Sequence, residues 1–129
     1  MGTEVVPLKV EDETPIPHVW RGTLVAIVDS LIRGDTRIGQ GIDNVEPLSE
    51  DDSTACRENV EAYGSVTLIP LPEGSWDTSV ASWWDGNRWD CLVDLWTAEE
   101  GRSDLVLHAT VFEDPEAGFR IHPGLIYVP

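Results

Sequence analysis

From residue 65 onward the sequence alternates apolar and polar residues, and this alternation limits the fold more than any other feature. A period of two indicates β-strands with one buried face. The stretches that carry it are residues 65–71, 76–84, 87–97, 104–113 and 119–128. Short turns separate the later stretches, so we expect them to pair in chain order as an antiparallel meander.

Glycine and proline positions indicate where these strands turn and end. Asp85-Gly86-Asn87 predicts a tight hairpin, because the favoured hairpin turns need residues that tolerate positive φ. Gly101 predicts a second turn of this kind inside a polar loop. Pro70 and Pro72 mark the first stretch as an edge strand or a strand end, because proline cannot donate to a sheet ladder.

Upstream of the strands, residues 18–33 predict an amphipathic helix. Pro17 suits its first turn, Arg33 its last turn and Gly34 the position just after its end. We expect its apolar stripe to cover one face of the sheet. The stripe has helical spacing and consists of Trp20, Leu24, Ile27, Val28 and Leu31.

A second helix is predicted from about residue 50 to residue 63. Ser49 with Asp52 resembles a capping pair, acids crowd the first turn, and Gly64 follows the end. The helix should be largely exposed because its apolar positions are few, namely Ala55, Val60 and Tyr63.

The fold class expected from these elements is α+β, with two N-terminal helices followed by a four- to five-stranded antiparallel meander sheet. Residues 1–17 are interpreted as an N-terminal arm with a short strand at residues 5–10, and residues 18–129 as a single α+β domain. This order is similar to that of the cystatin-like class, and the likeness implies a curved sheet that wraps a helix.

The charge balance limits the partners of the protein. The chain has 24 acidic and 8 basic residues and a net charge of −16. Such a field repels nucleic acid and anionic membranes and speeds encounter with basic proteins, so we expect a basic protein as partner and neither nucleic acid nor membrane. We find no signal peptide and no apolar run of membrane-helix length, and Cys56 and Cys91 are expected to be buried free thiols. These features predict a cytoplasmic protein.

The alternation also divides the strand residues between two sheet faces. One face should pack on the helix, and the other is where a function is expected. Six tryptophans in 129 residues favour a binding surface, because tryptophan is large and rarely fully buried. The candidate binding residues are Asp94, Trp96, Trp83, Trp84, Trp89, Glu99, Glu100, Arg102 and His108.

Asp94 has a functional and a structural interpretation. As a candidate general base or polar anchor, it would line a pocket between helix and sheet with Trp96 and His108 as walls. A glycosidase-type pair with Asp90 is disfavoured, because four residues of strand separate the two by about 13 Å, against roughly 5–10 Å in such pairs.

In the structural interpretation, Asp94 accepts hydrogen bonds from Thr78, Ser79 or Arg102 and fixes the sheet. Arg102 has the alternative of pairing with Glu99 or Asp104 across the polar turn, an exposed contact worth under about 1 kcal/mol.

No metal, cofactor or catalytic residue is predicted. His18, His108 and His122 are scattered without ligand spacing, and the two cysteines form no C-x-x-C motif. Phosphate-binding glycine loops and nucleophile motifs are missing from the sequence as well.

Several short stretches of the C-terminal half form a pattern, at Tyr63-Gly64, Leu71-Pro72, residues 76–80, 92–97 and 99–105, and Ile126-Tyr127-Val128. With these stretches the chain resembles a small uncharacterised bacterial domain family over roughly residues 61–129. The resemblance implies no particular activity. Small acidic bacterial domains of this build resemble, by type, immunity proteins that neutralise secreted toxins.

Three functions therefore stay open. The first is a non-enzymatic acidic binding protein of the bacterial cytoplasm, with an immunity protein against a basic toxin as its specific form. The second is a small enzyme or ligand-binding domain with a pocket around Asp94. The third is a structural module that forms a homodimer through a tryptophan-bearing sheet face.

Overall fold

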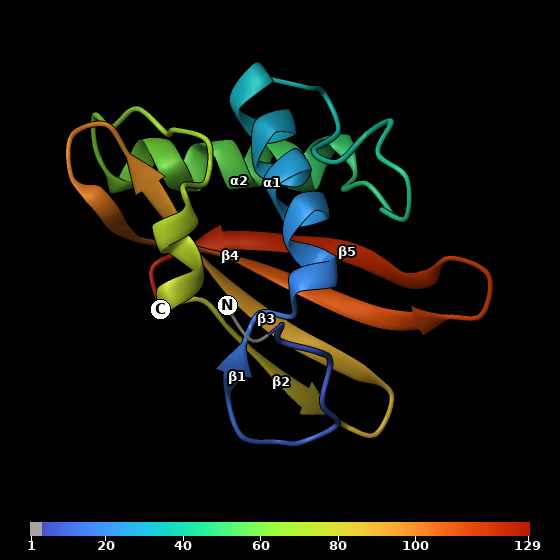
Figure 1. Ribbon diagram of the computed structural model, residues 1–129. Coiled ribbons are helices and arrows are strands. Elements are labelled where there is room, and N and C mark those ends of the chain that lie inside the picture. Colours follow the sequence, from blue (N-terminus) through green and yellow to red (C-terminus); the bar gives the residue numbers. More distant parts are fainter. Residues whose placement is uncertain (1–3) are drawn as a thin grey trace.

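The computed structural model describes residues 4–129 as an α+β arrangement of two helices and a five-stranded antiparallel sheet (Figure 1). The strands pair in chain order, which confirms the predicted meander. Residues 1–3 of the predicted arm lie outside the described part. The elements are β1 (Thr14–Pro15), α1 (His18–Arg33), α2 (Glu50–Tyr63), the 3-10 helix η1 (Glu73–Asp77), β2 (Val80–Trp84), β3 (Arg88–Thr97), β4 (Gly101–Asp114) and β5 (Gly118–Tyr127).

The core lies between α1 and one face of the sheet, which we call the inner face. On β3 this face bears Trp89, Cys91, Val93 and Leu95, all of which are buried. Helix α1 crosses this face with its predicted apolar stripe, also buried (Figure 1). Trp20 of the stripe meets Trp89 edge to face, with 5.1 Å between the ring centroids.

Both ends of α1 lie where the sequence predicts them. Pro17 precedes the first helical residue, and Gly34 follows the last one with a left-handed φ of 82°. That conformation turns the Gly34 N–H back to the Leu31 carbonyl oxygen at 3.2 Å, which satisfies one of the free carbonyls of the last turn.

Helix α2 contacts the rest of the domain through both polar and apolar residues. Its N-cap is the predicted one, since the Ser49 side chain accepts from the Asp52 N–H at 3.0 Å. Its buried residues are Ser53 and Cys56, of which Cys56 was expected to be buried. Ser53 is buried because its hydroxyl accepts a hydrogen bond from the Ile38 N–H at 2.9 Å in the loop after α1.

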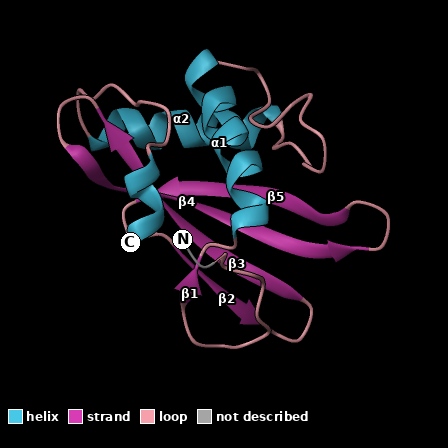
Figure 2. Ribbon diagram, in the orientation of Figure 1, coloured by secondary structure: helices cyan, strands magenta, loops and turns pink. Residues whose placement is uncertain are grey.

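The position of α2 explains its polar contacts, because the helix lies along the edge of β5 (Figure 2). A strand edge carries backbone groups without a strand partner. Asn59 of α2 donates to the Ile126 carbonyl oxygen at 2.8 Å. Residues 44–46 pair in parallel with Ile121 at the other end of the same edge. A side chain of α2 and the loop at residues 44–46 therefore cover parts of the outer edge of β5.

Two of the predicted strands differ from the structure. Residues 65–71 contribute a single bridge, between Leu68 and Thr97, and not a full strand. The stretch predicted at residues 76–84 begins inside η1, so that β2 starts only at Val80. Proline accounts for the first difference, since Pro70 and Pro72 interrupt any longer ladder.

Serine side chains take the place of the missing strand beside β3. The Ser75 hydroxyl donates to the Asp94 carbonyl oxygen at 2.9 Å, and the Asp94 N–H donates to the Ser79 hydroxyl at 2.9 Å. On the β4 side, where the register shifts, the Ser103 hydroxyl donates to the Leu95 carbonyl oxygen at 2.7 Å. Backbone groups of β3 are thus satisfied by hydroxyls where strand pairing stops.

The N-terminal arm returns to the sheet. Residues 5–10 do not form the expected strand, and the short strand β1 lies instead at Thr14–Pro15, paired with β2. The Leu8 carbonyl oxygen accepts from the Trp89 indole Nε1 at 2.9 Å. The arm therefore supplies the acceptor that this buried indole requires.

A bulge in β5 brings its backbone close to β4. The register shifts between Leu107 and Ala109, opposite Pro123 and Gly124 of β5. A Cβ added at Gly124 would lie 2.8 Å from the His108 carbonyl oxygen, which is closer than real Cβ contacts. The position therefore requires glycine for reasons of space.

We expect Gly124→Ala to lower the free energy of unfolding by about 1–3 kcal/mol, because backbone must move to admit the methyl group. The control is Gly22→Ala on the exposed side of α1, where a Cβ meets nothing within 4 Å. That variant should gain about 0.5–1 kcal/mol from helix propensity. Urea unfolding of both variants measures the difference, and a Gly124→Ala protein as stable as the parent contradicts the described packing.

Candidate functional site

Neither α1 nor α2 lies over the opposite side of the sheet, which η1 and Thr78 touch only beside Trp96 and Asp94, and we call this side of β2–β5 the open face. Figure 2 shows α1 in front of the strands and α2 beyond β5. On β3 the open face bears Asp90, Leu92, Asp94 and Trp96, each half-buried, whereas their inward neighbours are buried. The open face is therefore the sheet surface that the fold leaves accessible.

Five of the predicted binding residues lie on the open face. Asp94 and Trp96 belong to β3, and Trp96 pairs across the strands with Arg102 of β4. His108 of β4 pairs with Leu92 of β3, which lies between Asp90 and Asp94 on the same face. Trp84, at the end of β2, is 54% exposed. The alternation thus assigned Asp94, Trp96 and His108 to the correct face, because the face of a residue follows from its parity along the strand.

Trp83 and Trp89 lie on the inner face instead. Their rings meet edge to face at 4.5 Å, and Lys9 Nζ lies 5.1 Å from the Trp83 ring centroid. Trp89 is only 4% exposed, so it cannot serve as a surface anchor, contrary to our expectation. Trp20 and Trp76 are buried as well. The tryptophan surplus therefore serves the core more than a binding surface.

Asp94 is held by the segment that precedes β2. The Thr78 hydroxyl donates to a carboxylate oxygen of Asp94, in addition to the serine contacts with its backbone. Within the described residues, Arg102 forms none of the ion pairs. These contacts agree with the interpretation in which Asp94 fixes the sheet.

The Trp96 ring lies close to the backbone of η1 and of the β3–β4 turn. A Cβ at Gly74 of η1 would lie 3.3 Å from the ring, and one at Gly101 would lie 3.7 Å from it. The indole Nε1 is buried and has no hydrogen-bond partner among residues 4–129. Trp96 thus fills the space between η1 and the β3–β4 turn.

His108 and Asp90 form the polar centre of the open face. His108 Nε2 lies 3.3 Å from Asp90 Oδ1, and Arg88 Nε lies 3.8 Å from the same oxygen. In the described part of the chain, no group of three or more histidine, cysteine or acidic side chains could hold a metal ion.

The acids of the β3–β4 turn fasten it to the segment after α2. Glu99 accepts from the Thr67 N–H at 2.7 Å and from the Thr67 hydroxyl at 3.0 Å. Glu100 accepts from the Tyr63 hydroxyl at 2.7 Å. The backbone N–H of Thr67 holds the pKa of Glu99 below its ordinary value of 4.5. The polar loop around Gly101 is therefore a turn with structural acids, and Gly101 has the expected positive φ of 76°.

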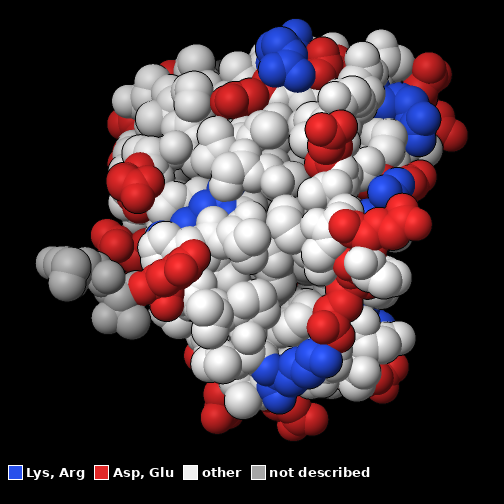
Figure 3. Space-filling view, turned by 45° about the vertical axis from the view of Figure 1, so that its right-hand side comes forward, with Lys and Arg blue, Asp and Glu red and all other residues white. Residues whose placement is uncertain are grey.

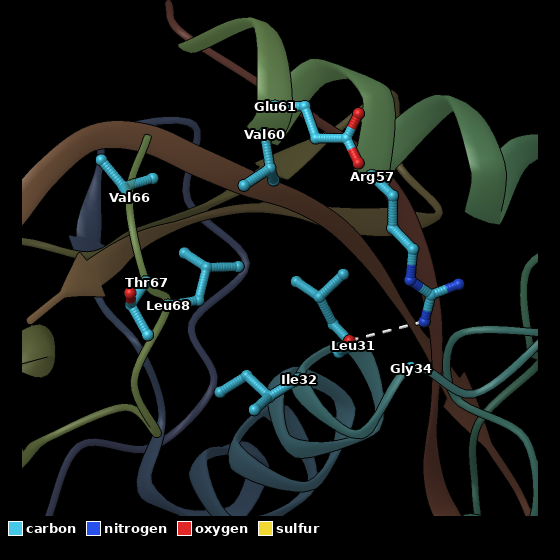
Figure 4. Close-up of a pocket in the computed structure, with 9 residues that line it drawn as sticks. All are labelled: Leu31, Ile32, Gly34, Arg57, Val60, Glu61, Val66, Thr67 and Leu68. Atoms are coloured by element: carbon cyan, nitrogen blue, oxygen red, sulfur yellow. Dashed lines mark hydrogen bonds between the residues drawn. The ribbon is translucent and has the colours of Figure 1, made fainter. Parts of the chain in front are cut away.

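A groove that the sequence did not reveal lies between the end of α1, helix α2 and residues 66–68 (Figure 4). It encloses about 400 Å³. Arg57 stands at one end and donates to the Leu31 carbonyl oxygen at 3.4 Å, while Glu61 stands on the α2 side. The apolar lining consists of Leu31, Ile32, Val60, Val66 and Leu68.

One sequence signal could have located this groove. Ile32 lies off the buried stripe of α1 and is 39% exposed, and an apolar residue outside the stripe has no role in the core. Val66 and Leu68 were predicted as strand residues. Whether they line the groove depends on the path of the chain after α2, which the alternation does not give.

Helix α2 presents acids beside this groove. It contains five acidic residues and one base, Arg57. Within the described residues, none of these acids takes part in an ion pair. Figure 3 shows acidic side chains at several separate places around uncharged residues, with few basic ones among them. The acids of α2 are Glu50, Asp51, Asp52, Glu58 and Glu61.

Both cysteines are buried free thiols, as predicted. Burial raises the pKa of the Cys91 thiol to about 12, and burial raises the pKa of Cys56 as well. The neutral thiol is the unreactive form, so neither cysteine is an activated nucleophile in this fold.

Comparison with known proteins gives one family match. A family model described as a domain of unknown function (DUF7668) matches residues 28–129. No curated protein and no solved structure matches the chain. None of the helices in the described part combines the length and apolar character that a membrane crossing needs.

The hydrogen bond from Thr67 to Glu99 predicts that the stability of the fold depends on pH. A folded-state pKa below the unfolded value means that the Glu99 carboxylate stabilises the fold above the unfolded pKa, and that this stability is lost as pH falls through the folded pKa. Glu99→Gln should therefore be less stable than the parent at neutral pH, and the gap should close on acidification. Urea midpoints across this pH range measure it, with Glu116→Gln as control. A gap independent of pH contradicts the assignment.

Proposed function

The chain belongs to the DUF7668 family, a domain of unknown function, and we propose that it is a non-enzymatic domain that binds a basic partner protein. The observation that carries the proposal is the apolar groove beside the acids of α2. An apolar anchor surrounded by charge is the usual composition of a protein interface.

The groove suits one apolar side chain of a partner, with basic side chains around it. Ile32 is accessible on one wall, and Glu61 stands at the opposite wall. Glu58 lies on the same exposed helix and is itself exposed. A lysine or arginine next to the apolar anchor would reach these carboxylates, and the net charge of −16 would steer such a partner toward the protein.

In its specific form, the proposal is that the protein acts in the bacterial cytoplasm as an immunity protein against a basic toxin. The support for this role is the acidic surface and the small size of the domain. A gene for a secreted toxin immediately upstream would favour the role, and a position inside a metabolic operon would count against it.

A pocket enzyme centred on Asp94 has less support. Asp94 belongs to the sheet and is held by Thr78, whereas the groove is lined by residues of α1, α2 and the segment after α2. The polar groups that line the groove are Arg57, Glu61 and Thr67, and the Thr67 hydroxyl donates to Glu99 instead of to another group of the groove.

The test uses an amphipathic helical peptide with leucines on one side and lysines on the other. Glu58→Lys/Glu61→Lys should weaken its binding roughly tenfold, because two attractive rim charges become repulsive. The matched control is Glu13→Lys/Glu116→Lys, which changes the net charge by the same amount at exposed acids away from the groove. Isothermal titration calorimetry measures both affinities.

Binding of the peptide should also weaken as salt is added, since ions screen exposed charges. Equal losses of affinity in the two double variants would mean that only the overall charge matters, and the groove would then not be the site.

A further inference from the structure

The open face differs in charge from the rest of the molecule. Its strand residues include all three bases found after residue 64, which are Arg88, Arg102 and Arg120. The acids on the same side of the strands are Asp90, Asp94, Asp104 and Asp114. The strand residues of this face therefore sum to a charge of −1 in a chain of −16, with Arg120 paired to Glu46 beside the sheet.

The open face also exposes large apolar and aromatic side chains. Trp84 is 54% exposed and Tyr127 is 38% exposed, and Leu92 and Phe112 between them are half-buried. Away from the end that η1 and Thr78 contact, a sheet face with exposed aromatics is a candidate contact surface.

We propose that the open face is the interface of a homodimer. Two copies of a −16 chain repel each other through every strongly acidic surface, so the nearly neutral face is where they approach at least cost. A basic partner, in contrast, is drawn to the acidic surfaces. The charge distribution thus selects a second copy of this chain as the occupant of the open face.

A two-fold axis brings positive side chains of this face in one copy opposite negative side chains of the same face in the other copy. Arg88 and Asp94 point to the same side of β3, six residues apart, which is about 20 Å along a strand. An axis that crosses the strands near Cys91 places Arg88 of each copy opposite Asp94 of the other. Such an isologous contact forms the same ion pair twice.

The dimensions of the face suffice for a stable contact. β3 has 10 residues, or about 33 Å, and four strands spaced by about 4.8 Å span roughly 19 Å. The resulting area is roughly 600 Å² per copy, so that a dimer buries more than the roughly 1,000 Å² expected of a biological interface.

Among residues 4–129, other segments occupy parts of both outer edges of the sheet. Residues 44–46 and Asn59 cover parts of the edge of β5. On the other side of the sheet, Trp83 of β2 donates its backbone N–H to the Val10 carbonyl oxygen of the arm at 2.8 Å. Edge-to-edge pairing needs free backbone groups, so these contacts favour face-to-face packing over it.

The experiment is light scattering over a concentration series at low and high salt. The expected mass rises from 14.3 kDa toward twice that value. Added salt should strengthen the dimer, because it screens the repulsion between two acidic chains. Binding of the basic peptide should weaken under the same change, so the failure of one proposal is distinguishable from the failure of the other.

Matched variants locate the interface. Trp84→Glu on the open face and Val19→Glu on α1 each add one negative charge at a residue that is 54% exposed. Trp84→Glu should raise the dimer dissociation constant by about tenfold or more, and Val19→Glu by less than about twofold. Thermal melting followed by circular dichroism checks that both variants fold.

Three results would overturn the proposal. One is a monomer mass at every concentration and salt level. Another is an equal loss of dimer in the two variants, and the third is a dimer that weakens as salt is added.

Discussion

The packing of α1 against β3 is the contact on which the rest of the structure depends. Trp20 of α1 meets Trp89 of β3, and the inward side chains of β3 are buried beneath the helix. Loss of a buried tryptophan costs about 3–5 kcal/mol, a large fraction of the stability of a domain of this size. This contact also decides which sheet face is covered, and therefore which face a partner can reach.

Side chains and loops complete the sheet where strands end. Ser75, Ser79 and Ser103 satisfy backbone groups of β3, and Asn59 does the same for β5. Each of these contacts joins residues that local pattern cannot connect, since a serine hydroxyl has no preferred backbone partner in the sequence. The contacts of Ser75 and Ser79 with Asp94 stand where β2 no longer runs beside β3, while Pro70 and Pro72 limit residues 65–71 to a bridge.

The proposed partners are separated by charge. A basic protein is directed to the acids of α2 and the groove beside them, while a second copy of the chain is directed to the nearly neutral open face. Because the two surfaces lie on different elements, one molecule can engage both partners. The exposure of the tryptophans also differs between the two faces of the sheet, since Trp84 is exposed on the open face and Trp89 is buried in the core.

The sequence by itself determined the helices, the strands β3 to β5 and, away from the bulges, the face on which their residues lie, because these follow from periods of 3.6 and two and from local turn residues. It placed Asp94, Trp96 and His108 on one face for the same reason. Tertiary structure alone decided that Trp89 is buried, that Glu99 is bound to Thr67, and that a groove forms beside α2. These features arise where elements far apart in the chain meet, and periodicity carries no information about such meetings.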